Sequence, residues 1–268
     1  MRFTIFGASG FIGSNLAKYL SGLGHEVLTP KRLEIKDAKE NLGNVIYAIG
    51  LTGNYRQLPP YEVVEAHVTI LSKIIKQATY DSWLYLSSTR IYQGLEGSVN
   101  ETSQIKVMPG VDGIYNISKL LGESLCLALN HSKVRVVRLS NVYGVGQSQH
   151  TFLGSLINNI NVQKNLLIEE DFKSSKDYIA ISDVVTMLEK IAINGSEHIY
   201  NLASGLSTTH KNITEKISSL TGCSVSFKIN APHRTFPVIN ISRIKEEFKF
   251  IPRNIMDDLN DFFIDDKK

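Results

Sequence analysis

Apolar residues recur along this 268-residue chain in two alternating patterns. Short apolar runs with strand propensity alternate with longer stretches in which apolar residues fall at helical spacing. Strands are predicted at residues 2–6, before about Leu28, and at 44–50, 82–88 and 134–141, and helices at 11–23, 61–78 and 115–130. Strands that alternate with helices indicate a parallel sheet covered on both faces. We therefore predict an α/β fold with a Rossmann-like, doubly wound parallel sheet.

The pattern changes after "VYGVGQ", where a helix at 152–160 is followed by a polar stretch and further short elements. We assign residues 1–145, joined by about 175–205, to a dinucleotide-binding Rossmann domain. Residues 146–174 and 206–268 are expected to form a small C-terminal substrate-binding lobe. The loop at 92–113 is long for a compact domain, and such loops often carry function.

Composition excludes several classes of protein. The chain is 43% hydrophobic and 21% charged, which is ordinary for a globular protein, and its net charge of +3 with scattered basic residues gives no reason to expect nucleic acid as a partner. No apolar run reaches membrane-spanning length, and the N-terminus lacks the features of a signal peptide. Two cysteines are too few for a disulfide framework, and the histidines lack the i, i+4 pairing of a zinc site. We expect a cytoplasmic protein without a metal.

Three glycines stand where the first strand gives way to the first helix. Gly7, Gly10 and Gly13 form a GxxGxxG pattern in "GASGFIG". Such a turn is tight, lets a pyrophosphate approach the backbone and allows close helix packing, while the helix N-terminus favours phosphate. A glycine-rich turn without a ligand is the alternative, but the strand before the turn and the helix after it favour a dinucleotide site.

The region after the second strand bears on the choice of cofactor. NAD-binding folds usually place Asp or Glu there to hold the ribose 2′-hydroxyl. In "HEVLTPKR", Glu26 comes early, and Lys31 and Arg32 follow the strand. Two cations suit a 2′-phosphate, so we predict NADP. The alternative is that both are solvated loop charges and that the cofactor is NAD.

"YNISK" places Tyr115 and Lys119 on one face of a predicted helix. A free tyrosine, with a pKa of about 10, is a poor acid–base catalyst at neutral pH. A nearby ammonium favours the phenolate and lowers that pKa, so the pair could transfer a proton. The spacing also arises by chance, as a surface tyrosine beside a solvated lysine, and its context decides between the two interpretations.

That context resembles the extended branch of the short-chain dehydrogenase/reductase family, which includes nucleotide-sugar epimerases, dehydratases and ketoreductases of carbohydrate biosynthesis. The resemblance runs nearly end to end through "GASGFIG", "YLSSTRIYQG", "YNISK", "RLSNVYGVGQ", "KDYIAISDVV", "IYNLASG" and "NISRIKEEFKFIP". It implies a catalytic triad of Ser88, Tyr115 and Lys119, with Thr89 as the reserve hydroxyl. It also implies that Lys119 binds the nicotinamide ribose. The candidate cofactor-binding residues are Gly7, Ser9, Gly10, Phe11, Ile12, Gly13, Lys31, Arg32, Gly50, Ser87, Tyr115 and Lys119.

For the substrate, the resemblance points to Thr89, to Asn141 in "NVYG", and to Arg234 as a partner of a nucleotide diphosphate. An arginine suits phosphate through its fork of donors, although Arg234 could equally be an ordinary exposed arginine. The chain departs from the family at Lys176, where arginine is common, and at His67, where asparagine is common. Asp177 is expected to fix a turn.

The resemblance implies hydride transfer between the nicotinamide and a keto or hydroxyl carbon of a nucleotide-activated sugar. A ketoreductase is the first expectation and an epimerase with tightly bound cofactor the alternative. A dehydratase fits less well, because Thr89 and Arg90 stand where that subgroup has an acidic pair. A non-catalytic dinucleotide sensor fits least, because both Tyr115 and Lys119 are present. The resemblance also implies a homodimer that pairs the helices at 61–78 and 115–130 across a two-fold axis.

Overall fold

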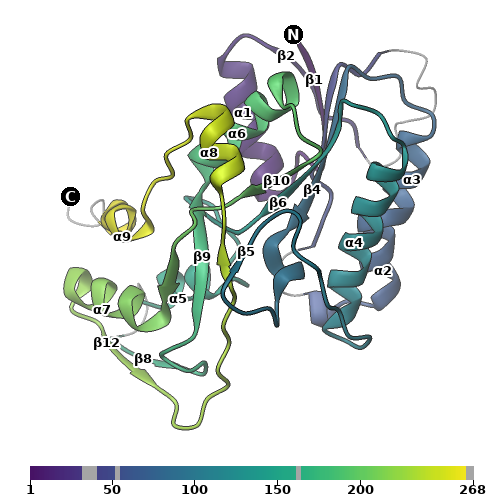
Figure 1. Ribbon diagram of the computed structural model, residues 1–268. Coiled ribbons are helices and arrows are strands. Elements are labelled where there is room, and N and C mark those ends of the chain that lie inside the picture. Colours follow the sequence, from purple (N-terminus) through teal and green to yellow (C-terminus); the bar gives the residue numbers. More distant parts are fainter. Residues whose placement is uncertain (32–40, 52–54, 161–163, 264–268) are drawn as a thin grey trace.

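A six-stranded sheet forms the centre of the molecule (Figure 1). The computed structural model describes residues 1–31, 41–51, 55–160 and 164–263. The spatial order of the sheet is β10-β6-β4-β3-β1-β2, and every neighbouring pair is parallel. Its strands are β1 (Arg2–Phe6), β2 (Glu26–Leu28), β3 (Asn44–Tyr47), β4 (Ser82–Ser88), β6 (Val134–Leu139) and β10 (Ile199–Leu202). The strand order reverses between β1 and β3, which is where doubly wound sheets bind their ligands.

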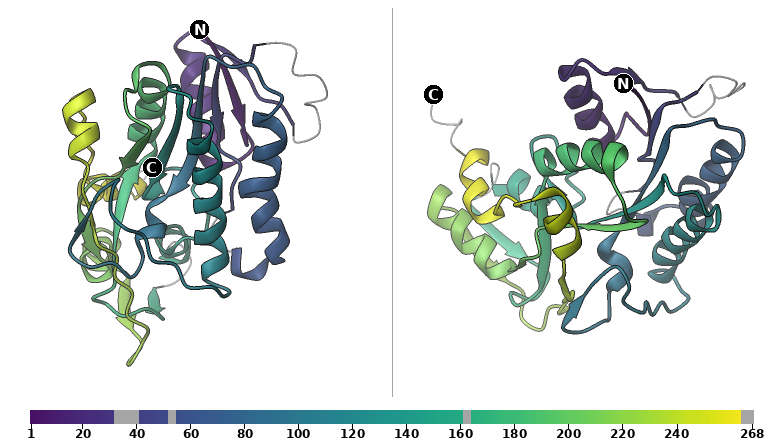
Figure 2. Two further views of the ribbon diagram at one scale, coloured as in Figure 1. Left: turned by 45° about the vertical axis from the view of Figure 1, so that its right-hand side comes forward. Right: turned by 45° about the horizontal axis from the view of Figure 1, so that its top comes forward.

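Helices cover both faces of this sheet, as Figures 1 and 2 show. One face carries α1 (Phe11–Gly22), α6 (Ile181–Asn194) and α8 (Ser242–Phe248), whose apolar residues share one core with β1, β4 and β10. The other face carries α2 (Pro60–Val64), η2 (Glu65–Thr69), α3 (Ile70–Ile75) and α4 (Gly113–Ala128), which close a second core around Trp83 and Tyr85. The predicted Rossmann-like fold is confirmed.

Two predicted elements differ in detail. The helix predicted at 61–78 spans Pro60 to Ile75, and its middle segment η2 is a π-helix, a wide turn that is often found at functional sites. The strand predicted at 134–141 is two strands: β6 ends at Leu139, and β7 (Asn141–Tyr143) leaves the central sheet to pair with β9. The chain therefore turns away from the sheet at Ser140, toward the second group of elements.

The remaining elements lie mostly beside the carboxyl ends of the central strands (Figure 2). They enclose a third apolar core that includes Tyr143, Leu156 and Ile213. Their sheets pair β11-β9-β7, β12-β8 and β13-β5. These elements are η1 (Tyr55–Gln57), η3 (Thr89–Tyr92), β5 (Ser98–Val99), α5 (Phe152–Ile160), β8 (Asn165–Ile168), β9 (Ser175–Ala180), β11 (Ser207–Thr209), α7 (His210–Thr221), β12 (Ser224–Phe227), β13 (Val238–Ile239), α9 (Ile255–Asp258) and η4 (Leu259–Phe262). In the described part of the chain, no helix combines the length and apolar character needed to cross a bilayer.

Helix α4 lies unusually close to the sheet. A Cβ atom added at Gly122 would come within 2.3 Å of the Tyr85 hydroxyl and 2.9 Å of the His67 carbonyl oxygen. One residue later, Glu123 pairs with Arg138 of β6 at 2.7 Å, with both side chains almost fully buried. The missing side chain and the buried ion pair together fix the height of α4 above the strands, and with it the position of Tyr115 and Lys119.

Candidate active site

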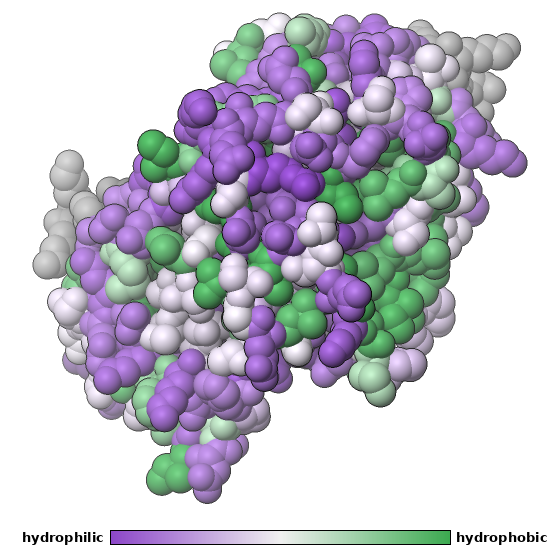
Figure 3. Space-filling model, in the orientation of Figure 1, coloured by the Kyte–Doolittle hydropathy of each residue, from purple (hydrophilic) through white to green (hydrophobic). Residues whose placement is uncertain are grey.

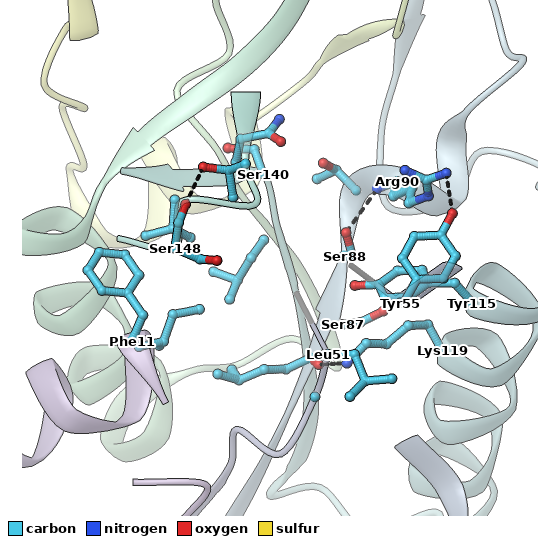
Figure 4. A pocket seen from close by; sticks show the side chains of 18 of the residues that line it. Phe11, Leu51, Tyr55, Ser87, Ser88, Arg90, Tyr115, Lys119, Ser140 and Ser148 are labelled. Atoms are coloured by element: carbon cyan, nitrogen blue, oxygen red, sulfur yellow. Dashed lines mark hydrogen bonds between the residues drawn. The ribbon is translucent and has the colours of Figure 1, made fainter. Parts of the chain in front are cut away.

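A cavity of about 410 Å³ opens at the carboxyl ends of the central strands, between the sheet and the second group of elements. Its wall includes residues that follow β1, β3, β4 and β6, together with residues of α4, α5 and β9. Figure 4 shows Ser88, Arg90, Tyr55, Tyr115 and Lys119 on one side of the cavity. Of the predicted site residues, those on its wall are Gly10, Phe11, Ile12, Gly13, Gly50, Ser87, Ser88, Thr89, Tyr115, Lys119, Asn141 and Arg234.

The glycine turn has the geometry of a phosphate cradle. Gly7 has a φ of +90°, and a Cβ atom there would lie 2.8 Å from the Ala48 backbone. At Gly13 a Cβ atom would lie 2.3 Å from the Gly7 carbonyl oxygen, so α1 can pack this closely only on a glycine. Gly10 stands at the N-cap of α1, which has no side-chain cap, and it lines the cavity. The free N–H groups of the first helical turn suit a pyrophosphate.

Tyr115 lies half-buried on α4 beside Ser88, the last residue of β4. Burial raises the pKa of Tyr115, while its hydrogen bond with the Ser88 hydroxyl and the charge of Arg90 act to lower that pKa. The Ser88 Oγ also accepts a hydrogen bond from the Arg90 backbone N–H at 3.2 Å. Phenol and alcohol are thus held together at the cavity wall.

Lys119 is buried one helical turn after Tyr115, and its Nζ donates to the Leu86 carbonyl oxygen at 2.9 Å. Burial lowers the pKa of Lys119 to about 7. Arg90 is a further cation that acts to lower the pKa of the Tyr115 phenol, and the sequence pattern did not reveal it. The effect of Lys119 on that phenol, expected from the YxxxK motif, remains a prediction.

His67 is a second buried group at this site, and no role for it follows from the sequence pattern beyond its departure from asparagine. It lies in the π-helical η2, and its ring meets the Tyr115 ring edge-on at 5.1 Å. Ser118 uses its hydroxyl proton to donate to the Tyr115 carbonyl oxygen, so the 2.8 Å contact with His67 requires that Nδ1 donate. Burial and the charge of Lys119 lower the pKa of His67 to about 2. The neutral ring therefore carries its lone pair on Nε2, which is buried without a partner.

Gly50 lies at the point where these groups meet. A Cβ atom at Gly50 would approach Lys119 Nζ at 3.4 Å and His67 Nε2 at 3.8 Å. Ser87, another predicted cofactor-binding residue, has a buried Oγ with no partner. Two unsatisfied polar atoms and one buried amine beside the cavity are the kind of lining that a polar ligand completes.

A cluster of polar side chains around Tyr55 forms a second part of this wall, and no sequence pattern predicts it. The Tyr55 hydroxyl accepts from Arg90 Nη2 at 2.7 Å and donates to Asp112 Oδ1 at 3.1 Å, and its ring lies 4.9 Å from that of Tyr115. Arg56 Nε donates to the same carboxylate oxygen. These residues come from η1, η3 and the start of α4, so only the fold brings them together.

The opposite end of the cavity is built from the second group of elements. Arg234 and Lys176 both line it, and partial burial, followed by the charges of Arg234, Arg90 and Arg56, lowers the pKa of the half-buried Lys176. Lys176 lies 3.8 Å from Glu170. Asn141 also lines the cavity, and its side chain donates to the Asp177 carbonyl oxygen at 2.8 Å. The Asp177 carboxylate accepts from the backbone N–H groups of Ser204 and Gly205, the turn-fixing contact expected for it.

Some predicted cofactor-binding residues lie away from the cavity wall. Gly7 allows the turn to pack against the Ala48 backbone, and Ser9 is exposed. Lys31 is exposed beyond the end of β2, and Arg32 lies outside the described residues. The cofactor preference inferred from Lys31 and Arg32 therefore remains a prediction.

Fold and site together define a dinucleotide-binding oxidoreductase of the extended short-chain dehydrogenase/reductase type. Residues 3–76 and 59–203 match the model of the NAD dependent epimerase/dehydratase family, and the chain belongs to that family. It is thereby an NAD(P)-dependent enzyme of the class that acts on nucleotide sugars. The glycine turn, the open N-terminus of α1 and the orphaned Ser87 Oγ fit such a cofactor.

Known proteins resemble the chain over most of its length. The uncharacterised UDP-glucose epimerase YtcB of Bacillus subtilis is 23% identical over 261 residues, covering 82% of this chain and 81% of the relative. The solved UDP-glucuronic acid 4-epimerase of Bacillus cereus superposes with a TM-score of 0.80 at 17% identity and covers 98% of both chains. RMD from Pseudomonas aeruginosa, solved with NADPH, gives 0.79 at 20% identity and the same coverage. At these identities the solved structures establish the fold.

Proposed function

We propose that the chain is an NAD(P)-dependent oxidoreductase that transfers a hydride to or from a carbon of a nucleotide-activated sugar, most specifically a ketoreductase. The observation that carries the proposal is the meeting of Ser88, Tyr115 and Lys119 on one cavity wall, beside the glycine turn. The bound nicotinamide supplies the hydride chemistry. This chain's side chains hold the sugar oxygen and move its proton.

In this mechanism the Ser88 hydroxyl holds the reacting oxygen, and the Tyr115 phenol gives that oxygen a proton during reduction. The Arg90 guanidinium, 5.8 Å from the centre of the Tyr115 ring, favours the phenolate that remains. Lys119 is already fixed on the Leu86 carbonyl oxygen, so its remaining N–H bonds can point toward a ribose hydroxyl.

The nucleotide part of the substrate is assigned to the opposite end of the cavity. Arg234 and Lys176 supply two cations there for a diphosphate, and Asn141 and Thr89 supply polar contacts to the sugar. Of these residues only Arg234 belongs to the proposed substrate-binding lobe, residues 146–174 and 206–268, while Lys176, Asn141 and Thr89 reach the cavity from the part assigned to the Rossmann domain. The relatives support the class of ligand, since solved neighbours contain UDP-glucuronic acid or UDP-glucose.

Assay of turnover separates the candidate reactions. Purified protein is incubated with NADPH or NADH and a panel of 4-keto nucleotide sugars, while absorbance of the reduced cofactor is followed. Consumption of cofactor with formation of a hydroxyl product supports a ketoreductase. Formation of a sugar isomer without net consumption supports an epimerase, the alternative favoured by the relative named as a UDP-glucose epimerase. No reaction with any sugar would contradict both.

We further propose NADP as the preferred cofactor, from the cations at positions 31 and 32. In a Lys31→Ala variant the ratio of kcat/KM for NADPH to that for NADH should fall severalfold, because one partner of the 2′-phosphate is lost. An unchanged ratio would leave NAD as the better assignment. We also place the enzyme in the cytoplasm, where nucleotide sugars are available as substrates.

A homodimer through the long helix Pro60–Ile75, which comprises α2, η2 and α3, and through α4 is part of the proposal. Figure 3 shows hydrophobic residues gathered on the side of the molecule where these helices lie. Tyr61, Ile117 and Leu121 are exposed there, with Leu121 51% accessible. A contiguous apolar face of this kind is typical of an interface between copies. Light scattering should give the mass of a dimer, and Leu121→Arg should reduce it to that of a monomer.

A further inference from the structure

Two of the cations on the cavity wall have no ligand assigned to them under the proposed function. In the part of the chain that the structure describes, its cationic wall residues are Arg56, Arg90, Lys119, Lys176 and Arg234. Two wall carboxylates, Glu170 and Asp177, face them, and Asp177 is engaged by backbone N–H groups. Under the proposed function, Lys119 serves the cofactor, and Lys176 and Arg234 serve the diphosphate. Arg56 and Arg90 remain without an assigned ligand.

Arg90 lies at the reactive end. It follows Ser88 and Thr89 directly, and its guanidinium carbon is 5.1 Å from the Tyr55 ring centre and 5.8 Å from the Tyr115 ring centre. Stacking on two phenol rings fixes the plane of the guanidinium beside the proton-transfer pair. Figure 4 shows the Arg90 side chain next to Ser88, with both tyrosine rings close by.

Structural support of the neighbouring loop explains part of this arrangement. Arg90 Nη2 donates to Tyr55, and Arg56 Nε donates to Asp112. The Asp112 carboxylate is therefore shared between Arg56 and Arg90, since it lies 3.9 Å from the Arg90 guanidinium. The Asp112 side chain is 64% exposed, so water weakens both pairs. Arg90 Nε, however, is buried and has no hydrogen-bond partner. A buried donor of a charged group without an acceptor is costly, so a change that brings an acceptor to Arg90 would stabilise it.

The second observation is the mutual repulsion of the cations. Arg56 and Arg90 act on Lys176 across the cavity in the same direction as Arg234 does. One carboxylate shared by two guanidinium groups leaves a net positive charge at the catalytic end. An anion of the ligand that enters between them relieves this repulsion.

We propose that the sugar of the substrate carries a carboxylate, held by Arg90 and Arg56, so that the substrate class is a nucleotide-linked uronic acid or its keto form. This inference rests on the proposed function and deepens it. A planar carboxylate with two oxygens matches the guanidinium fork better than a hydroxyl does. Because Arg90 borders both Ser88 and Tyr115, the carboxylate is attached to the ring carbon next to the one that reacts.

Binding measured in matched ligand pairs tests this inference. Cofactor-loaded protein is titrated by calorimetry with UDP-glucuronic acid and UDP-glucose, and with GDP-mannuronic acid and GDP-mannose. Within the pair whose nucleotide the protein accepts, the acid should bind about tenfold or more tightly than the neutral sugar. Binding is the readout because Arg90 also acts on Tyr115, so an activity assay would mix the two effects.

Variants connect the preference to the two arginines. Arg90→Gln and Arg56→Gln should each reduce the preference for the acid to about threefold or less. Affinity for the neutral sugar should stay within about twofold, which also shows that the cavity is intact. Arg243→Gln, a change of the same kind on α8 outside the cavity, should leave the preference unaltered.

Two results would overturn the inference while the proposed function stands. One is equal affinity for both members of a bound pair, and the other is a preference for the acid that survives both arginine variants. Failure of all four ligands to bind would also overturn the inference, whereas the proposed function is decided separately by the turnover assay with 4-keto nucleotide sugars.

Discussion

The two ends of the cavity are built in different ways. At the catalytic end, Ser88, Tyr115 and Lys119 come from β4 and α4, which are locked together by Gly122 and by the Glu123–Arg138 pair. At the nucleotide end, Arg234 is exposed and lies outside any helix or strand. Rigid elements hold groups to the precision that chemistry needs, while loops accommodate variable parts of a ligand. Changes at the first end should therefore alter kcat, and changes at the second should alter KM.

Tyr115→Phe should have the largest effect. It removes the proton donor while keeping the ring that packs on Tyr55 and His67. We expect kcat to fall by about 10²–10⁴-fold, the usual contribution of a general acid. Steady-state kinetics check this, with cofactor affinity unchanged. Tyr61→Phe, on α2 and outside the cavity wall, is the matched control and should retain normal turnover, because the ring that forms the proposed dimer face is kept. Full activity in Tyr115→Phe would remove the mechanism.

Arg234→Gln should have an intermediate effect of a different kind. Loss of one charge-assisted bond to a diphosphate corresponds to about 10–100-fold in KM, with kcat changed little. Lys176→Gln should act in the same direction, because both side chains line the same end of the cavity. Titration of initial rates against nucleotide sugar measures the two constants separately. A drop in kcat with KM unchanged would contradict the assignment of this end to the nucleotide.

The smallest effect concerns stability rather than turnover. Lys119 has a pKa of about 7 in the folded protein, against 10.5 as its ordinary value. Between these values the unfolded chain binds more protons than the native state does, so stability rises with pH. For the cofactor-free protein, the free energy of unfolding should increase by about 2 kcal/mol from pH 7 to pH 9.

Urea denaturation at several pH values measures this slope. Lys119→Met should flatten it, whereas Lys211→Met, which removes an exposed lysine of α7, should keep it. A slope that is equally steep without Lys119 would show that other groups produce it. On the acidic side, His67 acts in the same direction: its pKa of about 2 lies below the ordinary 6.5, so stability falls further as pH drops below 6.5.

The comparison of the two ends also separates what the sequence could and could not reveal. The central sheet was predictable because its buried strands and covering helices have strong, distinct periodicities. Strands of two or three residues, such as β5 and β13, are too short to show any period. The π-helical turn at η2 was invisible for a related reason, since a change of one residue per turn is lost in an apolar pattern that continues through it.

Within the site, predictable residues were those inside local motifs. Ser88, Tyr115 and Lys119 line one cavity together, although their catalytic roles stay predictions. The Tyr55–Arg90 contact joins residues 35 positions apart, and no sequence pattern in either segment predicts it. The lowered pKa values of Lys119 and His67 likewise depend on burial, which only the packed structure determines.

Gly122 sets the distance between helix α4 and the central sheet. The absence of a side chain there lets the helix that carries the Tyr115 phenol lie close to the strand that ends at the Ser88 alcohol. A methyl group there would force the helix outward and lengthen that separation, without altering any reactive atom. The packing distance between α4 and the sheet thus controls the geometry of the site, although the residue that sets this distance lies outside the cavity.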